Sequence, residues 1–404
     1  MNNITKILIL LLFLPLLLRS QGEFNNWYFG KYPEGTGVTF NSGTPVPVAN
    51  GVFGNIGITV NISDSLGNLL FFSDGKYIYN NNKTIMPNGT GLSAGFIDGG
   101  QPVLAVPKPD DDSSYYLFTV GNLQLLGTSI GFLYSIVNMR LDAGLGDIES
   151  VNKNLSVSGA ETAWLSITGT RHKNNQDIWI VTTISSFDSL HYASFLLDGY
   201  GLSSSPVLSE SMSGVTYHPP LLPYKTPPIA IKISPDGTKL IGLYGGDDNE
   251  FCTFNPLTGQ VERMFFINLN DPTSGFVSAE FSIDSKYLYL SHSTLPGLSG
   301  KILQFDASLT DSTQFMQSKV VIDSGFTRAC LQMGPDWKIY GSEIEKDSLS
   351  VIKNPSIIAP GCNYQRNALG LIGYCSDGLP QFIQRYKAYI HSTGQCQGNP
   401  IHFS

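Results

Sequence analysis

The chain carries little charge for its length. Only 14 % of its 404 residues are Asp, Glu, Lys or Arg, against about 25 % in an average soluble domain. Coiled coils and helical bundles depend on Glu, Lys, Ala and Leu, so this composition excludes them, and 11 % aromatic residues exclude a disordered chain. With 24 basic against 32 acidic residues and no basic cluster, the sequence predicts no nucleic-acid partner, because such binding needs Lys and Arg to neutralise phosphates.

A hydrophobic run long enough to span a bilayer is also missing. Residues 7–18 form a 12-residue apolar run after Lys6 and before Arg19, whereas a spanning helix needs about 20 apolar residues. We interpret residues 1–20 as a signal peptide, whose removal leaves 22 basic and 32 acidic residues and a net charge of −10. We therefore expect an exported protein, extracellular or on the outer cell surface, with the periplasm as the alternative and no membrane insertion of the mature chain.

Cysteines are few, and motifs for metal binding are lacking. The six histidines show no metal-pair spacing and the sequence has no Cys-x-x-Cys. Among the five cysteines we predict a disulfide between Cys362 and Cys375, which lie thirteen residues apart beside turn residues in an exported chain. We expect no cofactor. Calcium at residues 110–112 or 247–250 is a weaker alternative to solvated hairpin tips, since neither segment has the twelve-residue calcium-loop pattern.

Turn-forming and aromatic residues are abundant, with 42 Gly, 23 Pro, 23 Phe and 19 Tyr, and this combination predicts an all-β fold. An apolar strand, a tight turn and a second strand recur along the chain, most clearly at 233–241, 281–289 and 333–340. The turns are anchored at intervals of 48, 62, 62, 48 and 52 residues by Asp64, Asp112, Asn174, Asp236, Asp284 and Asp336.

Such a hairpin with one or two further strands in about 50 residues is typical of a propeller blade. Six anchors leave strand-like remnants at 26–40 and 378–383, which we expect to pair and complete one more blade. The sequence thus predicts a β-propeller over residues 21–390, with seven blades of four antiparallel strands. Six or eight blades are the alternatives.

Several ordered motifs carry a resemblance to a known family: Asn26-Trp27-Tyr28-Phe29-Gly30, Ser73-Asp74-Gly75, Val106-Pro107-Lys108-Pro109, Cys362-Asn363-Tyr364 and Gly378-Leu379-Pro380-Gln381-Phe382-Ile383-Gln384. Through nearly the whole mature chain the sequence resembles the N-terminal propeller of Bacteroidota gliding-motility-associated, type IX secretion-linked surface proteins. In that family immunoglobulin-like modules of the polycystic-kidney-disease (PKD) type follow the propeller. The resemblance implies that residues 391–404, with Cys396, are the truncated start of such a module.

Polar residues in register around a propeller could form a ring in its central channel and bind a ligand or an ion. Aligning the repeated turns puts Lys232, Glu280 and Gln332 at one position of the strand before the turn, and Asn61 joins them with a one-residue gap. Arg328 and Glu161 are weaker members of the same candidate ring. The alternative is that the repeat position alone favours a polar, water-lined strand.

No catalytic constellation is evident. Gly91-Leu92-Ser93-Ala94-Gly95 matches the G-x-S-x-G hydrolase elbow, but it follows a turn and not a strand. We therefore expect a non-catalytic propeller that binds a protein or a surface glycan, as an adhesion or scaffold module. The alternatives are a propeller hydrolase or lyase acting on sugars or lactones at the channel, and a periplasmic component of the secretion or motility machinery.

Overall fold

The computed structural model describes residues 22–30, 35–49, 52, 57–94, 100–121, 131–185, 189–211, 215–217, 224–226, 228–244, 249–269, 274–294, 300–326, 329–376 and 378–383. Strands dominate these residues. Their helices are short: α2 (Ser312–Gln317) and the 3-10 helices η1 (Gly22–Phe24), η2 (Asp142–Gly144) and η3 (Ser150–Asn152). The all-β prediction is confirmed.

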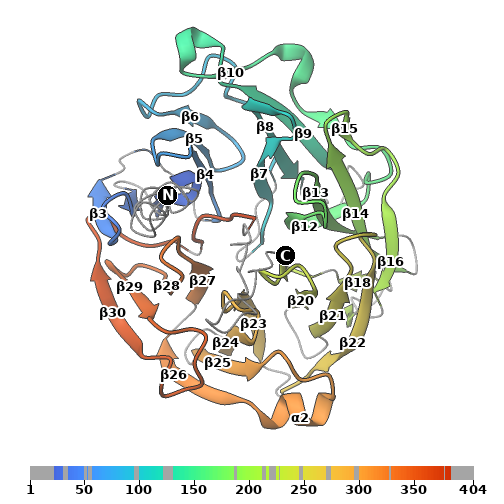
Figure 1. The fold of residues 1–404 in the computed structure, drawn as a ribbon, viewed down its shortest axis with the longest axis vertical. Coiled ribbons are helices and arrows are strands. Elements are labelled where there is room, and N and C mark those ends of the chain that lie inside the picture. Colours follow the sequence, from blue (N-terminus) through green and yellow to red (C-terminus); the bar gives the residue numbers. More distant parts are fainter. Residues whose placement is uncertain are drawn as a thin grey trace, which may run out of the picture.

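Seven antiparallel sheets follow one another around a centre and form a seven-bladed β-propeller, as predicted (Figure 1). Five sheets have four or five strands, and the first two have three each within the described residues. The first strand of each blade lies nearest the centre, beside the first strands of the neighbouring blades.

The strands of the seven blades, in chain order, are β1 (Asn26–Phe29), β2 (Thr36–Thr39), β3 (Val46–Ala49); β4 (Val60–Ser63), β5 (Leu69–Ser73), β6 (Ile78–Asn80); β7 (Val103–Lys108), β8 (Asp111–Val120), β9 (Phe132–Asn138), β10 (Asp147–Ile148), β11 (Leu155–Ser156); β12 (Ala163–Arg171), β13 (Ile178–Ser185), β14 (Leu190–Asp198), β15 (Gly201–Leu202), β16 (Val207–Ser211); β19 (Ala230–Ile233), β20 (Lys239–Leu243), β21 (Asn249–Phe254), β22 (Val261–Ile267); β23 (Ser274–Phe281), β24 (Tyr287–Thr294), β25 (Gly300–Asp306), β26 (Val320–Phe326); and β27 (Ala329–Met333), β28 (Ile339–Glu343), β29 (Ser348–Ile352), β30 (Tyr364–Gly370). A separate hairpin of β17 (Val215–Tyr217) and β18 (Tyr224–Thr226) lies between the fourth and fifth blades in the sequence.

The repeated turns join the first and second strands of the blades, and their local chemistry explains why they recur. In the second blade, Asp64 accepts hydrogen bonds from the backbone N–H groups of Leu66 (2.8 Å) and Asn68 (2.9 Å). The equivalent positions Gly237, Ser285 and Trp337 all have positive φ values of 57–66°, which this turn type requires. Asp112 is the exception among the anchors, because it lies inside β8 and the turn falls just before it.

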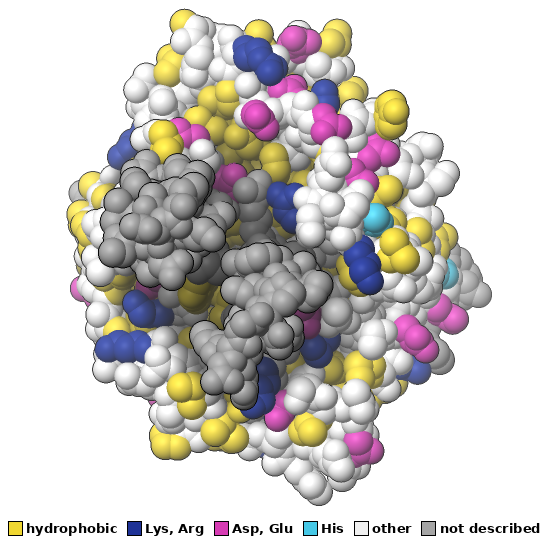
Figure 2. All heavy atoms as spheres, viewed as in Figure 1, with side chains coloured by type: hydrophobic (Ala, Val, Ile, Leu, Met, Phe, Trp, Pro, Cys, Tyr) yellow, Lys and Arg dark blue, Asp and Glu magenta, His cyan; other side chains and the backbone are white. Residues whose placement is uncertain are grey.

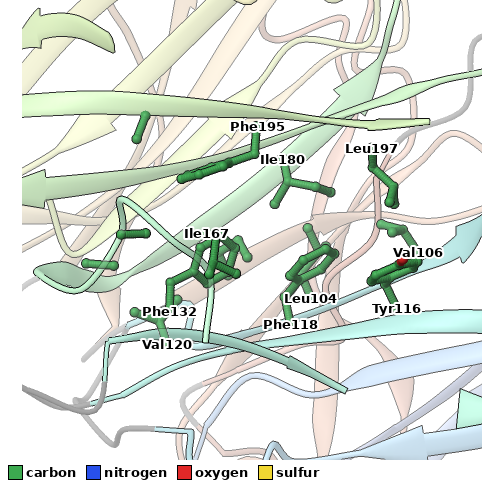
Figure 3. Close-up of a cluster of buried hydrophobic side chains, with 14 of the residues drawn as sticks. Leu104, Val106, Tyr116, Phe118, Val120, Phe132, Ile167, Ile180, Phe195 and Leu197 are labelled. Atoms are coloured by element: carbon green, nitrogen blue, oxygen red, sulfur yellow. The ribbon is translucent and has the colours of Figure 1, made fainter. Parts of the chain in front are cut away.

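Burial follows the position of a strand within its blade. First strands such as β4 and β19 are buried at every residue, because neighbouring blades cover both of their faces. Outer strands such as β16 alternate between buried and exposed residues. Figure 3 shows one interface between blades, in which side chains of β7 and β8 pack against side chains of β12, β13 and β14.

The expected pairing of the two chain ends is wrong. Among the described residues, strands β1–β3 form the first blade without a partner from the C-terminal segment, and residues 378–383 form no strand. Pro380 has no N–H to donate to a sheet, and the apolar side chains of this segment are buried between blades. The ring closes instead where the last blade lies beside the first (Figure 1). There the Tyr340 ring centroid lies 5.5 Å from those of Trp27 and Phe40.

The described part of the chain covers most of the predicted propeller, residues 21–390. The predicted signal peptide at 1–20 and the predicted truncated module at 391–404 lie outside the described residues. Within the described part, no helix is long and apolar enough to cross a membrane.

Candidate functional site

Three of the in-register polar residues meet at the centre of the ring. Lys232 on β19, Glu280 on β23 and Gln332 on β27 are at most 6 % exposed. Lys232 Nζ lies 2.7 Å from Glu280 Oε2 and 3.3 Å from Gln332 Oε1. Each charge of a pair this deeply buried requires a partner. Here Lys232 of the fifth blade and Glu280 of the sixth are each other's partner.

The Glu280 carboxylate also links the sixth blade to the seventh. Its Oε2 accepts a hydrogen bond from the backbone N–H of Met333 on β27, and its Oε1 accepts one from its own neighbour Phe281, both at 2.9 Å. Ser278 Oγ, two residues earlier on β23, accepts the N–H of Leu331 at 2.9 Å. Glu280 and Ser278 of β23 thus accept hydrogen bonds from N–H groups of β27, the first strand of the next blade. These N–H groups would otherwise be buried without partners.

Asn61 lies between the first and second blades. Its hydrogen bonds go to residues beside those blades and not to Lys232, Glu280 or Gln332. Its Oδ1 accepts the backbone N–H of Tyr28 at 2.7 Å, and its Nδ2 donates to Thr59 Oγ1 at 3.1 Å. Asn61 faces the preceding blade, whereas the Glu280 carboxylate contacts both neighbouring blades, at Lys232 of the fifth and the Met333 N–H of the seventh. The one-residue gap in the alignment explains this difference, since a shift of one residue turns a strand side chain to the opposite face.

The two weaker members of the candidate ring do not extend it. Glu161 is exposed in the turn before β12, where its Oε1 accepts the backbone N–H of Gly159 at 3.1 Å. Arg328 lies outside the described residues. Of the candidate ring, the described centre therefore holds one cation, Lys232, and one anion, Glu280, paired with each other.

Residues 378–383 and Gln101 also lie at the centre, where the sequence did not place them. Residues 378–383 lie there, all buried; the Gln381 N–H donates to Thr59 O at 2.8 Å, and Gln381 Nε2 donates to Ile167 O. Gln101 reaches in from the third blade, and its Oε1 accepts the N–H of Ile231 at 2.9 Å. No sequence pattern pointed to Gln101, and Gln381 was predicted only as part of a strand-like remnant.

A small cavity remains beside these residues. Its walls include Lys232, Gln332, Gln381, Gln101 and Ser278, and about 20 Å³ is open to the centre of a water molecule. This volume holds about one water and is far below the several hundred Å³ of a small-molecule site. This cavity can therefore hold a solvent molecule, but not a sugar or a lactone.

Acidic clusters considered for calcium have other partners. Asp111 pairs with Arg140 at 2.9 Å, and Asp110 accepts a hydrogen bond from Gln176 at 2.8 Å. In the second cluster Asp247 and Asp248 lie outside the described residues. No group of three His, Cys, Asp or Glu side chains in the described part is arranged to hold a metal.

Glu250 was predicted to lie at a solvated hairpin tip, and this prediction is wrong. It is fully buried between the fourth and fifth blades, where Oε2 accepts hydrogen bonds from Tyr192 (2.8 Å), Tyr244 (3.1 Å) and Ser211 (3.1 Å). Burial raises the pKa of both tyrosines well above the usual value. The tyrosines therefore stay protonated and act as donors to the carboxylate.

The predicted disulfide is also wrong, because Cys362 and Cys375 are both free thiols. Cys362 packs with Tyr289 between the sixth and seventh blades, whereas Cys375 packs with Trp27 between the seventh and first. The two thiols belong to different cores, which spacing along the chain does not reveal. Burial raises the pKa of Cys375 to about 12, so neither core presents a reactive thiolate at neutral pH.

Comparison with known proteins bears on the fold alone. No protein-family model and no curated protein matches the chain. Among solved structures, a Bacteroides uniformis protein named as a putative 6-phosphogluconolactonase matches with a TM-score of 0.50 and 11 % identity, over 87 % of this chain and 98 % of that one. An extracellular domain of a one-component-system protein from B. thetaiotaomicron matches with a TM-score of 0.37 and 12 % identity, over 87 % of this chain and 35 % of that one. At 11 % identity, the likeness to the Bacteroides uniformis protein shows a shared fold alone.

Proposed function

We propose that this protein is an exported, non-catalytic β-propeller that binds a protein or glycan of the cell surface through the loops of one face. The observation that carries the proposal is the closed centre: the candidate-ring charges Lys232 and Glu280 are buried there and paired with each other. An enzyme acting at the channel needs several ionisable groups free to reach one substrate atom. Within the described residues, the cavity beside this pair is too small for a substrate, which supports a non-catalytic role.

The two faces of the disc differ in their connections. One face carries the short turns after the first strands, such as 64–68, 234–238 and 282–286. The opposite face carries turns such as 74–77 and is where one blade ends and the next begins, as at the end of β22 and the start of β23. Loops held by a rigid scaffold are where binding residues concentrate. We call these the turn face and the loop face, and we assign binding to the loop face.

Surface charge supports a protein or glycan partner. On the face shown in Figure 2, acidic and basic side chains of the described residues are interspersed, without a basic cluster of the kind that nucleic acids or anionic lipids need. The predicted signal peptide at 1–20 supports export. The resemblance to gliding-motility-associated surface proteins supports a role as an adhesion or scaffold module in that setting.

A face-blocking experiment tests the assignment. A polymer of about 5 kDa is attached to Tyr77→Cys on the loop face, and in a matched control to Leu66→Cys on the turn face of the same blade, both in a Cys396→Ser background. Both native side chains are exposed. Binding to intact source cells and to immobilised surface polysaccharide is expected to fall for the Tyr77 conjugate and to persist for the Leu66 conjugate. Equal binding by the two conjugates contradicts the loop-face assignment.

Two further measurements separate the alternatives. Hydrolysis of sugar lactones by the full chain is expected to match the buffer rate, and a saturable rate above it would favour the hydrolase alternative. Labelling of intact cells with a membrane-impermeant amine reagent is expected to modify the protein. Labelling only after the outer membrane is opened would favour the periplasmic alternative.

A further inference from the structure

Residues 378–383 occupy the centre of the ring without belonging to any blade. All six are buried, yet none is a strand residue, and the seven sheets contain no residue of this segment. The ring is also closed without it, since Tyr340 of the last blade packs on Trp27 and Phe40 of the first. The segment therefore lies in a channel whose walls are formed by the rest of the chain.

Two hydrogen bonds from Gln381, one from its backbone and one from its side chain, hold the segment across the channel. The Gln381 backbone N–H donates to Thr59 O beside the second blade, and Gln381 Nε2 donates to Ile167 O on β12 of the fourth blade. The remaining side-chain atom, Oε1, is buried and has no hydrogen-bond partner in the described residues. Gln381 also lines the cavity that contains Lys232 and Gln332, a polar site where one water can complete its bonding.

Apolar side chains on either side of Gln381 fill separate recesses. The Phe382 ring centroid lies 4.8 Å from that of Phe24 and 6.0 Å from that of Trp27, beside the first blade. Ile383 packs in the core between the third and fourth blades. Gly169 leaves the space for it, because a Cβ there would lie 2.8 Å from Ile383 Cγ2.

We propose that the channel is a peptide-binding site and that residues 378–383 are its resident, intramolecular ligand. The site takes an extended segment with a glutamine amide at its centre and large apolar side chains around it, as in Gly-Leu-Pro-Gln-Phe-Ile. Gln381 sets the register and Phe382 is the main anchor. A segment of a partner protein with the same chemistry would compete for the channel. This inference goes beyond the loop-face binding proposed above and does not depend on it.

A cleavage experiment tests whether the segment behaves as a bound ligand. A seven-residue recognition site for a specific protease is inserted after Ser376 in the full chain, and the folded protein is cleaved, which leaves residues 377–404 held only by non-covalent contacts. We expect this peptide to co-elute with the ring in gel filtration. We also expect an excess of synthetic peptide with the sequence of residues 376–386 to displace it.

Variants identify the contacts responsible. Phe382→Ala and Gln381→Leu are each expected to speed release of the cleaved peptide at least tenfold. Tyr374→Ala, at an exposed position before the cut, is the matched control and is expected to leave release unchanged. Immediate release from a ring that stays folded would show that the channel has no affinity for the segment. Unfolding of the ring on cleavage would show that the segment is part of the folding core. Either result overturns the proposal, and neither affects binding by the loop face.

Discussion

Replacing Lys232 with methionine removes the cation from the buried pair at the centre of the ring. Glu280 then remains fully buried without its partner 2.7 Å away. Breaking a buried ion pair in this way costs about 3–5 kcal/mol. We expect the lower end, about 3 kcal/mol, because Glu280 keeps two backbone N–H donors, from Phe281 and Met333. With an unfolding entropy of roughly 2.1 cal/mol/K per residue over about 360 residues, this loss lowers the Tm by about 4 °C.

Calorimetry or urea unfolding measures the effect, and two further variants make it decisive. Lys239→Met breaks an exposed pair, Lys239 to Asp236 at 3.4 Å, and is expected to cost less than about 1 kcal/mol. Lys232→Met combined with Glu280→Gln removes both charges and is expected to recover most of the loss, apart from about 1 kcal/mol for a weakened hydrogen bond. If Lys232→Met lowered the Tm no more than Lys239→Met does, the account of the centre as a buried, paired site would be refuted.

Three other predictions follow from contacts outside the trio. Asn61→Leu leaves the buried N–H of Tyr28 without its acceptor at 2.7 Å and should reduce the free energy of unfolding in urea by about 1–3 kcal/mol. A change below about 0.5 kcal/mol, the usual range for surface substitutions, would contradict this hydrogen-bond assignment. Burial raises the pKa of Tyr79 to about 12, helped by the nearby charges of Asp74 and Tyr77, and burial with a hydrogen bond to Asp323 raises that of Tyr364 to about 12. The unfolded chain loses these protons near pH 10, whereas the folded protein keeps them, so stability should fall between about pH 10 and pH 12. The double variant Tyr79→Phe, Tyr364→Phe should show a shallower fall in stability over this range. An unchanged slope would argue against the raised pKa values. Three cysteines are buried thiols: Cys252, Cys362 and Cys375. Iodoacetamide at pH 8 should therefore modify them only after denaturation, which mass spectrometry of native and unfolded samples would show. A disulfide between Cys362 and Cys375 would instead leave these two residues unmodified in both samples.

The blades could be predicted from the sequence because their signals are local. Asp64 and its counterparts bond to the N–H groups of their own turns, so the residue type and the turn appear together wherever the repeat occurs. The meeting of Lys232, Glu280 and Gln332 followed from the same register, since equivalent positions of neighbouring first strands face the centre. The alignment failed at Asn61, where a gap of one residue reversed the face of the strand.

Features that depend on the closed ring were beyond the sequence. Residues 378–383 have the apolar pattern of a strand, and only the assembled blades show that they lie in the channel, with Gln381 bonded to Thr59 and Ile167. Cys362 and Cys375 are neighbours in sequence but belong to the cores on opposite sides of the last blade. Glu250 looked like a surface carboxylate because its three hydroxyl donors come from Tyr192, Ser211 and Tyr244, two of them on another blade.

The closed centre is the central claim of this account, and amide hydrogen exchange of residues 378–383 tests it most directly. The Gln381 N–H is buried and bonded to Thr59 O, and buried, bonded amides exchange only when the surrounding structure opens. The account predicts that a peptide covering this segment exchanges as slowly as peptides from the first strands β19 and β23. Exchange within seconds, as in an exposed loop, would show that the channel is open and would contradict both the closed centre and the function inferred from it.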